Sequence, residues 1–349
     1  MKTTIEILDT TLREGEQTNN VSFSTKQKIE IAKLLDKVGV DFIEVGHPAI
    51  SRKIARDIKK ICQLKLKAEI IGHARATRED IDKVLECGCS WVGIFMGIND
   101  LSVRHKYHMS KKEAQARFLD ALKYAKQKGL KIRCSIEDGS RTKINDWINF
   151  AKKAERIGVD RISVIDTVGS MTPSKMHKLV KEIKKHIKTD LNVHCHNDFG
   201  MAVANSLAAY EAGIKCIDVT VNGLGERAGI ASLSTICAAL TVLYKINKWN
   251  LKLIPQISKL VEKYSKMDIP FRQPIVGKNV FTHKGGLHSV AVLENPKVYE
   301  LIYPEIMGRK REIIVGKFTS KKVLRNYLEK NNKDICEKEV NKIFNQLKS

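Results

Sequence analysis

Short apolar runs alternate with longer amphipathic runs eight times along the first 248 residues. We expect the short runs to form strands at residues 4–8, 41–45, 67–72, 91–96, 131–136, 161–165, 191–196 and 216–221. The amphipathic runs predict helices at 24–38, 51–62, 78–87, 111–128, 144–157, 173–187, 202–212 and 232–246. Regular alternation of strand and helix indicates a parallel sheet with helical crossovers. Eight such units predict an α/β fold that closes into a (β/α)8 TIM barrel.

An open, doubly wound sheet is the alternative, but it usually has fewer strands and carries a glycine-rich fingerprint after its first strand. Residues 9–16 read Asp-Thr-Thr-Leu-Arg-Glu-Gly-Glu and lack that fingerprint. After residue 248 the alternation stops, and helical patterns occur at 254–267, 320–330 and 337–346. We therefore expect a catalytic barrel over residues 1–248 and a helical C-terminal extension over residues 249–349.

The chain contains 62 Lys and Arg against 39 Asp and Glu, which gives a formal net charge of +23. A basic balance of this size is typical of nucleic-acid-binding proteins, which interleave aromatic residues with a basic stripe. Here aromatic residues make up only 6%, and the lysines are spread over the expected helices, for example Lys181, Lys184, Lys185 and Lys188. We therefore expect a solvated basic surface and no nucleic-acid partner.

No apolar stretch reaches the roughly 18 residues that a membrane span requires. Residues 1–6 lack the apolar core and cleavage site of a secretory signal. We therefore expect a cytoplasmic protein without a membrane partner. The eight cysteines are scattered, and Cys87 and Cys89 form C-x-C rather than paired C-x-x-C motifs, so a structural zinc site is not expected.

Polar and ionisable residues concentrate where the expected strands end, which is where the active site of a barrel lies. They are Asp9, Arg13, Glu14, Gln17, His73, Arg75, Arg133, Ser135, Glu137, Asp166, Thr167, the segment 194–198, Asn222 and Gly223. Polar residues at one strand end would fit an ordinary turn. Their presence at most strand ends favours a functional site.

His194 and His196 form the strongest local signal. Side chains two residues apart on a strand point to the same side, so both imidazoles face inward together. Two such imidazoles suit a metal ion, although two hydrogen-bonded core histidines remain an alternative. Glu14 and Asn222 could complete the ligand set with oxygen atoms. Mixed nitrogen and oxygen ligands suit Mg, Mn, Co or Zn, and such an ion would polarise a substrate carbonyl.

Arg13, Arg133 and His73 suggest binding of a carboxylate, because a guanidinium group matches a carboxylate with two parallel hydrogen bonds. The alternative for each arginine is a structural ion pair, with Glu137 or Asp9 as a plausible partner. Residues 223–229 form a glycine-rich segment that could bind phosphate at a helix start. A tight turn without any ligand is the alternative for that segment.

Taken together, residues 9–17, 194–198, 222–227, 281–288 and 295–299 resemble the acetyl-CoA-dependent enzymes that condense 2-oxo acids. These are the homocitrate, 2-isopropylmalate and citramalate synthases. The resemblance implies a metal-dependent Claisen condensation, followed by hydrolysis of the thioester and release of CoA. It also implies a homodimer, in which the C-terminal segment of one subunit reaches into the barrel of the other.

The resemblance assigns roles residue by residue. It implies the metal ligands Glu14, His194, His196 and Asn222. It implies the catalytic residues Arg13, Glu137, His288 and Tyr299. It implies the substrate-binding residues Arg13, Gln17, His73, Arg133, Ser135 and Thr167. It implies contacts to the co-substrate acetyl-CoA from Asn222, Gly223, Gly225, Glu226 and Arg227.

Within that family, 2-oxoglutarate is the expected oxo acid, and homocitrate synthase the expected activity. Glu14 follows Arg13 as in many homocitrate synthases, and a buried Arg133 would be costly in a pocket for an aliphatic acid. The segment 46–48, Gly93 and Phe95 depart from the expected pattern. Synthases of 2-isopropylmalate, citramalate or (Re)-citrate therefore remain alternatives. A lyase or aldolase of the same superfamily is a more distant one, because residues 223–229 contain no cysteine.

Overall fold

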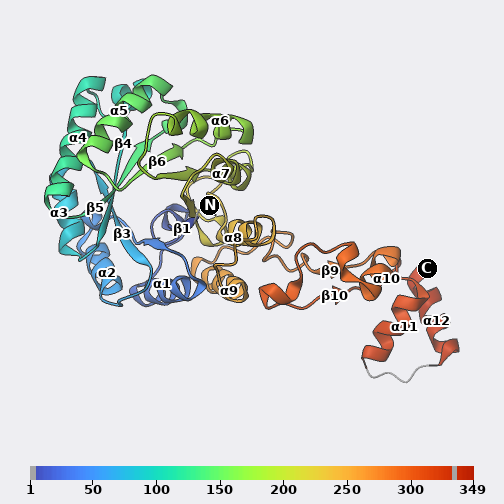
Figure 1. Cartoon of the computed structure of the whole chain (residues 1–349). Coiled ribbons are helices and arrows are strands. Elements are labelled where there is room, and N and C mark those ends of the chain that lie inside the picture. The colour runs from blue at the N-terminus through green and yellow to red at the C-terminus, as the bar shows by residue number, and fades with distance from the viewer. Residues whose placement is uncertain (1–4, 332–335) are drawn as a thin grey trace. The chain divides into compact units, whose positions relative to one another are not determined.

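The computed structural model describes residues 5–331 and 336–349, so residue 4 of the first expected strand lies outside it. Eight parallel strands pair in sequence order and close into a barrel, as Figure 1 shows. They are β1 (Glu6–Asp9), β2 (Phe42–Glu44), β3 (Glu69–Arg75), β4 (Trp91–Gly97), β5 (Lys131–Glu137), β6 (Arg161–Asp166), β7 (Leu191–Cys195) and β8 (Cys216–Val219). The predicted (β/α)8 barrel is confirmed.

Helices follow the strands and surround the barrel. They are α1 (Thr25–Val38), α2 (Arg52–Cys62), α3 (Arg78–Glu86), α4 (Lys111–Gln127), α5 (Ile144–Ile157), α6 (Pro173–Lys184), α7 (Ala202–Glu211) and α8 (Leu233–Val242). Local sequence sets their ends. Ser24 and Ser110 form capping boxes at the starts of α1 and α4, and Gly39 ends α1 in the left-handed conformation.

Every strand ends one to three residues away from its expected end, and three of these differences concern the candidate site. Strand β3 continues to Arg75, so His73 belongs to the strand itself. Strand β7 ends at Cys195, and His196 pairs only through an isolated bridge to Ile230. Strand β8 ends at Val219, because a short helical turn over Val221–Gly223 follows with a left-handed backbone at Asn222. Apolar periodicity locates the strands, but the site-forming turns decide where pairing stops.

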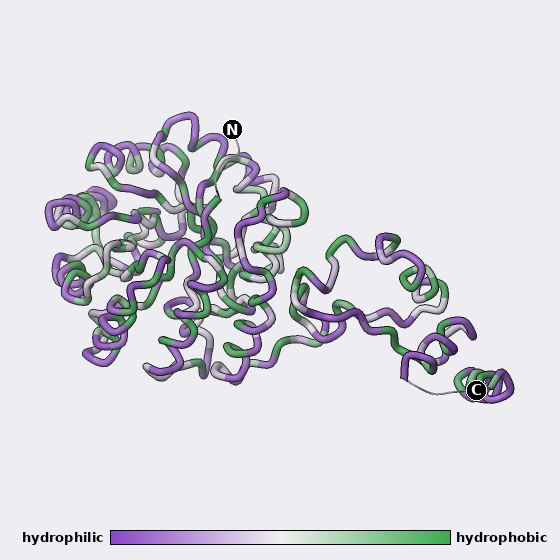
Figure 2. Tube along the Cα trace, turned by 60° about the horizontal axis from the view of Figure 1, so that its bottom comes forward, coloured by the Kyte–Doolittle hydropathy of each residue, from purple (hydrophilic) through white to green (hydrophobic). Residues whose placement is uncertain are grey.

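The barrel interior changes character along its axis. Near the strand starts, one buried apolar cluster contains Leu8, Phe42, Ile71, Trp91 and Cys216. Figure 2 shows hydrophobic stretches gathered toward the inside of the barrel and hydrophilic ones along its outer edge. Farther along the strands, the buried side chains become polar, and they include Glu44, Arg133, Ser163, Asn192 and Asp218. A polar layer therefore lies under the end of the barrel where the strands finish.

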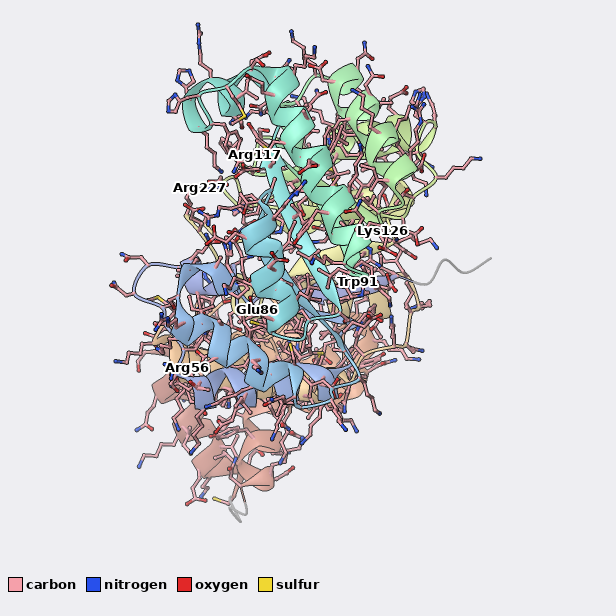
Figure 3. The ribbon with its side chains drawn as sticks, turned by 90° about the vertical axis from the view of Figure 1, so that its left-hand side faces the viewer. Arg56, Glu86, Trp91, Arg117, Lys126 and Arg227 are labelled. Carbon is pink, nitrogen blue, oxygen red and sulfur yellow. The ribbon has the colours of Figure 1, made fainter. Side chains whose placement is uncertain are left out.

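The outer surface of the barrel carries many exposed charged side chains. Figure 3 looks onto α2, α3 and α4 and shows long charged side chains such as Arg56, Glu86 and Lys126. The four lysines singled out in the sequence around α6 are all exposed. No helix within residues 5–331 and 336–349 has both the length and the apolar character that a membrane crossing requires.

The chain divides into two compact units. One comprises Met1–Cys237 and Ile257–Asp268, which hold the barrel and most of α9 (Ile254–Ser265). The other comprises Ala238–Gln256 and Ile269–Ser349. This second unit contains α10 (Gly286–Glu294), α11 (Lys321–Lys330) and α12 (Glu337–Lys348). It also contains a two-stranded parallel sheet of β9 (Thr282–His283) and β10 (Glu312–Ile313). Helix α10 and this sheet were not expected from the sequence.

Replacing Asp9 by Asn should make the stability of the barrel less sensitive to a rise in pH from about 4 to 7. Asp9 is fully buried, its Oδ1 accepts from the Thr11 amide at 2.9 Å, and its Oδ2 has no partner among the described residues. Burial raises the pKa of Asp9 from 3.8 to about 7. The folded protein therefore holds a proton that the unfolded chain releases, so wild-type stability falls as pH rises from about 4 to 7.

Asn keeps the acceptor for Thr11 but cannot ionise, so the variant should gain stability relative to wild type across that range. Urea midpoints of the metal-free proteins at several pH values between about 4 and 8 measure this. A difference between the two proteins that stays constant over this range would contradict the prediction.

Candidate metal and substrate site

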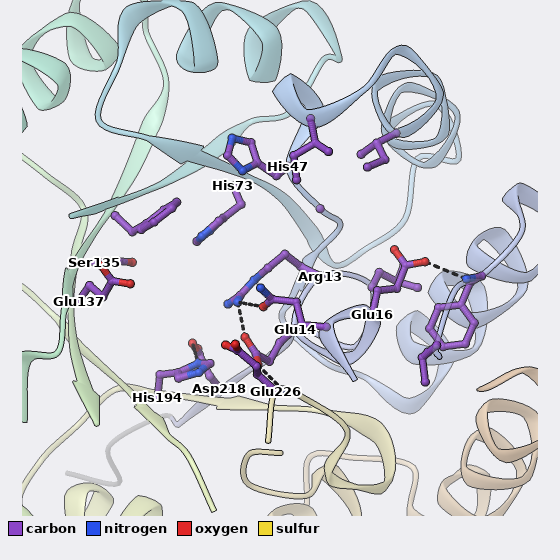
Figure 4. Close-up of a pocket in the computed structure, with 18 of the residues that line it drawn as sticks. Arg13, Glu14, Glu16, His47, His73, Ser135, Glu137, His194, Asp218 and Glu226 are labelled. Carbon is purple, nitrogen blue, oxygen red and sulfur yellow. Dashed lines mark hydrogen bonds and ion pairs between the residues drawn. The ribbon is translucent and has the colours of Figure 1, made fainter. Parts of the chain in front are cut away.

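A cavity of about 670 Å³ opens at the end of the barrel where the strands finish. Figure 4 shows side chains from several strands and loops pointing into it. It brings together most of the residues singled out from the sequence, namely Arg13, Glu14, Gln17, His73, Arg133, Ser135, Glu137, Thr167, His194, His196 and Glu226. The structure therefore brings these residues together around one cavity.

Glu14, His194 and His196 form a buried cluster whose ligand atoms lie within 4.8 Å of one another. The two histidine Nε2 atoms are 3.3 Å apart. The Nδ1 atom of His194 lies 3.0 Å from Oδ2 of Asp218, and this contact directs the other ring nitrogen toward His196. Such a carboxylate–histidine pair is the arrangement that orients metal-binding imidazoles. Two imidazoles and one carboxylate thus fit a divalent cation such as Zn, Co, Mn or Mg.

The protonation states of this cluster also suit a metal. Burial opposes ionisation of Glu14, but the adjacent charge of Arg13 outweighs this effect, and the pKa of Glu14 is lowered to about 2. Burial, and then His194, lower the pKa of His196 to about 4. At neutral pH the carboxylate is therefore ionised and the His196 imidazole is neutral. Those are the forms that coordinate a cation.

The glycine-rich segment lies beside this cluster, and Asn222 immediately precedes that segment in the chain. The side-chain amide of Asn222 donates to the Ser258 carbonyl at 3.0 Å. The Glu226 amide donates to Oε1 of Glu14 at 2.9 Å, so the segment holds a candidate ligand in place. Arg227 is engaged with Asp198 at 2.7 Å. Helix α8 begins only at Leu233, four residues beyond the segment, so these glycines do not form a helix start.

Two buried acids that the sequence analysis did not single out hold the arginines of the site. Glu44 of β2 accepts from Nε of Arg13 at 2.6 Å and also pairs with Nη2 of Arg133. Asp218 of β8 accepts from Nη1 of Arg133 at 3.1 Å. These partners are not Glu137 or Asp9, which the sequence analysis had considered. The sequence signal that could have identified these two acids is an acidic residue at an inward-facing position of an otherwise apolar strand.

Gly93 makes room for this arrangement. A Cβ atom at Gly93 would lie 3.1 Å from Nη2 of Arg133 and 3.2 Å from Oε1 of Glu44, so any larger residue would press on the ion pair. His73 approaches the same carboxylate, with Nδ1 at 3.1 Å from Oε1 of Glu44. Burial lowers the pKa of His73 to about 4, so its ring is neutral near pH 7. Its face stacks on Phe95 at a ring-centre distance of 4.5 Å.

Glu137 at the end of β5 has partners that the sequence analysis also missed. Nζ of Lys106 lies 2.7 Å from Oε1 of Glu137, and the Tyr107 hydroxyl donates to Oε2 at 3.2 Å. Gln17 accepts from Nη1 of Arg13 at 3.2 Å, and Thr167 accepts from the Asp138 amide at 2.9 Å. The side chains of the cavity are thus fixed largely by one another.

His288 and Tyr299 belong to the second unit and lie close together there. Their ring centres are 4.4 Å apart, and 47% of Tyr299 is exposed. Leu287 beside them is 79% exposed. The resemblance placed His288 and Tyr299 together in proton transfer, and the structure brings the two rings into contact.

Comparison with known proteins adds family relationships. Residues 4–261 match the HMGL-like family model, and residues 275–349 match the model described as homocitrate synthase post-HMGL domain-like. The chain is 45% identical to a homocitrate synthase of Pyrococcus abyssi over 93% of this chain and 90% of that protein. It is 40% identical to the homocitrate synthase AksA of Methanothermobacter thermautotrophicus over 99% of this chain and 88% of that protein.

Solved structures share the barrel. The HMG-CoA lyase of Bacillus subtilis superimposes with a TM-score of 0.70 at 21% identity, covering 77% of this chain and 96% of that one. The lyase of Pseudomonas aeruginosa gives a TM-score of 0.69 at 19% identity, with the same coverage. At these identities the likeness establishes the fold alone.

Changing Gly229 to Ala should weaken metal binding. Gly229 has φ +77°, and an added Cβ would lie 1.8 Å from the Gly223 carbonyl oxygen. The segment must therefore move and withdraw the Glu226 amide from Glu14. We expect Co²⁺ affinity, measured by titration of the visible Co²⁺ absorption, to fall at least about tenfold.

Gly200→Ala is the matched control. Gly200 has φ +72°, and its Cβ would meet nothing within 4 Å. This variant should therefore lose about 1–2 kcal/mol of folding free energy, the cost of a left-handed backbone at a residue with a Cβ, without any loss of Co²⁺ affinity. Equal affinities for the two variants would contradict the role given to the segment.

Proposed function

This chain belongs to the homocitrate synthase family, and we propose on that basis that it condenses acetyl-CoA with 2-oxoglutarate and water to give homocitrate and CoA. It is then an acyltransferase whose acyl group becomes an alkyl group in the product. The observation that carries the proposal is one cavity that combines the Glu14, His194 and His196 cluster with donors suited to a second carboxylate.

Those donors are found on β5. Nε of Arg133 and Oγ of Ser135 are buried and have no hydrogen-bond partner among the described residues. Both residues line the cavity, and their side chains point to the same side of the strand. A distal carboxylate would satisfy both donors, whereas an aliphatic side chain would leave them unpaired at a cost of about 1–3 kcal/mol each. This difference favours a dicarboxylic oxo acid.

The metal cluster supports the other end of the substrate. A divalent cation bound by Glu14, His194 and His196 would supply Lewis-acid polarisation of the 2-oxo carbonyl. Asn222 remains a further candidate ligand by resemblance. Arg13 lies beside Glu14 with its guanidinium held by Glu44, and it can stabilise negative charge that develops on the substrate oxygen.

Proton transfer is proposed for Glu137, His288 and Tyr299. Glu137 stands at the cavity rim, where its carboxylate forms an ion pair with Lys106. We propose that the His288–Tyr299 pair of one subunit completes the barrel site of a second subunit in a homodimer. The exposure of Leu287 and Tyr299 is consistent with a surface that a partner covers. Gly223, Gly225, Glu226 and Arg227 are the proposed contacts for acetyl-CoA.

A substrate panel tests the activity. With acetyl-CoA and Mg²⁺, Mn²⁺, Co²⁺ or Zn²⁺, release of free thiol should give the highest kcat/KM for 2-oxoglutarate, above oxaloacetate, pyruvate and 2-oxoisovalerate. If 2-oxoisovalerate is the best substrate, the dicarboxylate assignment is wrong. If no acid releases CoA, the synthase assignment itself fails.

The variant Ser135→Ala tests the proposed binding of the second carboxylate in the same assay. It should raise the KM for 2-oxoglutarate by about tenfold, a loss of about 1.4 kcal/mol, and leave the KM for acetyl-CoA unchanged. Ser206→Ala is the control, because Ser206 is equally buried but donates to the Ala202 carbonyl in α7.

Mixing two inactive variants tests the shared site. Glu137→Ala removes a barrel residue, and His288→Ala removes a residue of the second unit. If the site combines two subunits, a heterodimer of these variants contains one intact site and one doubly altered site. Unfolding and refolding an equal mixture should therefore restore about a quarter of wild-type activity. A mixture that stays inactive would show that each chain completes its own site.

A further inference from the structure

A series of buried contacts connects the metal cluster with the oxo-acid donors, and both of its ends, Glu14 and His194, belong to that cluster. It runs from Glu14 to Arg13, Glu44, Arg133, Asp218 and His194. Glu44, Arg133 and Asp218 are at most 2% exposed, so each charge depends on its neighbours for compensation. Figure 4 shows Arg13, Glu14, His194 and Asp218 facing the same space. We call these six residues the buried charge ring.

Asp218 is the member of this ring that contacts both a candidate metal ligand, His194, and the substrate-binding candidate Arg133. Its Oδ2 lies 3.0 Å from Nδ1 of His194 and accepts from Nη1 of Arg133 at 3.1 Å. Its Oδ1 accepts from Nδ2 of Asn192 at 2.7 Å. Asn192 in turn accepts from the Ser163 hydroxyl at 2.6 Å. Both carboxylate oxygens are therefore fixed, and rotation of this side chain would break several contacts.

Glu44 is the contrasting acid in the ring. Its Oε2 accepts from Nε of Arg13 at 2.6 Å and from the Thr10 hydroxyl at 2.8 Å. Its Oε1 contacts Arg133 and lies 3.1 Å from Nδ1 of His73. Glu44 thus orients three residues assigned to the substrate, but it contacts none of the candidate metal ligands.

We propose that Asp218 is a positioning residue that sets the metal-binding tautomer of His194 and the orientation of Arg133 with a single carboxylate oxygen, whereas Glu44 positions the substrate arginines alone. A proton on Nδ1 of His194 is held by Asp218, which leaves the lone pair on Nε2 for a cation. The same oxygen pulls one arm of Arg133 toward β8 and so aims its free Nε donor. Metal affinity and oxo-acid affinity therefore share one structural cause.

The substitution Asp218→Asn would remove this control of the His194 tautomer and of the Arg133 orientation. Asn has the size of Asp but carries no charge, and it offers an amide donor that can face Nδ1 of His194. The imidazole would then favour the opposite tautomer, with the proton on Nε2, where it cannot bind a metal. The loss of charge also leaves Arg133 with only Glu44 as counter-ion.

The decisive experiment compares Asp218→Asn with Glu44→Gln. Co²⁺ is titrated into the metal-free proteins without substrate, and its visible absorption reports affinity and ligand geometry. We expect Asp218→Asn to lower Co²⁺ affinity by about 10- to 100-fold. We expect Glu44→Gln to leave that affinity within about threefold. In the thiol-release assay, both variants should raise the KM for 2-oxoglutarate.

Two further variants guard against a trivial loss of folding, which circular dichroism monitors. Asp218→Glu keeps the charge and should recover part of the Co²⁺ affinity. Asn192→Ala removes only the contact that fixes Oδ1 of Asp218, and it should lower the affinity by a smaller factor than Asp218→Asn. A folded Asp218→Asn protein with wild-type Co²⁺ affinity would overturn the proposal. So would a Glu44→Gln protein that loses Co²⁺ as strongly.

The KM measurement rests on the proposed function, whereas the Co²⁺ titration does not. If wild type releases no CoA with 2-oxoglutarate while Asp218→Asn still loses Co²⁺ affinity, the proposed reaction fails and the positioning role of Asp218 stands. If the reaction is confirmed while Co²⁺ affinity is unaffected by Asp218→Asn, the positioning role fails alone.

Discussion

One guanidinium group held between two carboxylates organises the polar layer at the end of the barrel where the strands finish. Arg133 is buried with Glu44 on one side and Asp218 on the other, each carried by a different strand. A charge in this position would be strongly destabilising without its counter-ions. Closure of the barrel arranges β2, β5 and β8 around one axis, so that the charges of Glu44, Arg133 and Asp218 compensate one another. The fold and the site therefore depend on the same contacts.

The sequence predicts the architecture well because the barrel depends on periodic patterns. Apolar runs separated by amphipathic ones require a parallel closed sheet, and capping residues such as Ser24 and Gly39 define helix ends locally. The pair of histidines was also accessible, because positions 194 and 196 alternate in step with the strand. Each of these inferences needs only neighbours within about ten residues.

The buried acids show which features local sequence patterns cannot predict. Glu44 and Asp218 lie 174 positions apart, and only closure of the barrel brings both to Arg133. A single acid in an apolar run looks the same whether it faces a partner, a metal or a helix. The roles of His288 and Tyr299 were likewise inferred only from the family resemblance, because no periodic pattern connects them to a barrel strand. Contacts between distant segments therefore required the structure.

The strong positive charge of the chain and the near balance of charges inside the cavity have different consequences. Surface lysines are solvated, and physiological salt screens their field beyond about 8–10 Å, so they contribute only a weak, nonspecific attraction to anionic substrates. Inside the ring, Arg13 and Arg133 are already neutralised by Glu44 and Asp218. In the proposed function, the donors left over for a substrate carboxylate are Nε of Arg133 and Oγ of Ser135. On this proposal, selectivity would come from unsatisfied hydrogen-bond donors with fixed directions, and the acids that neutralise Arg133 would also orient it.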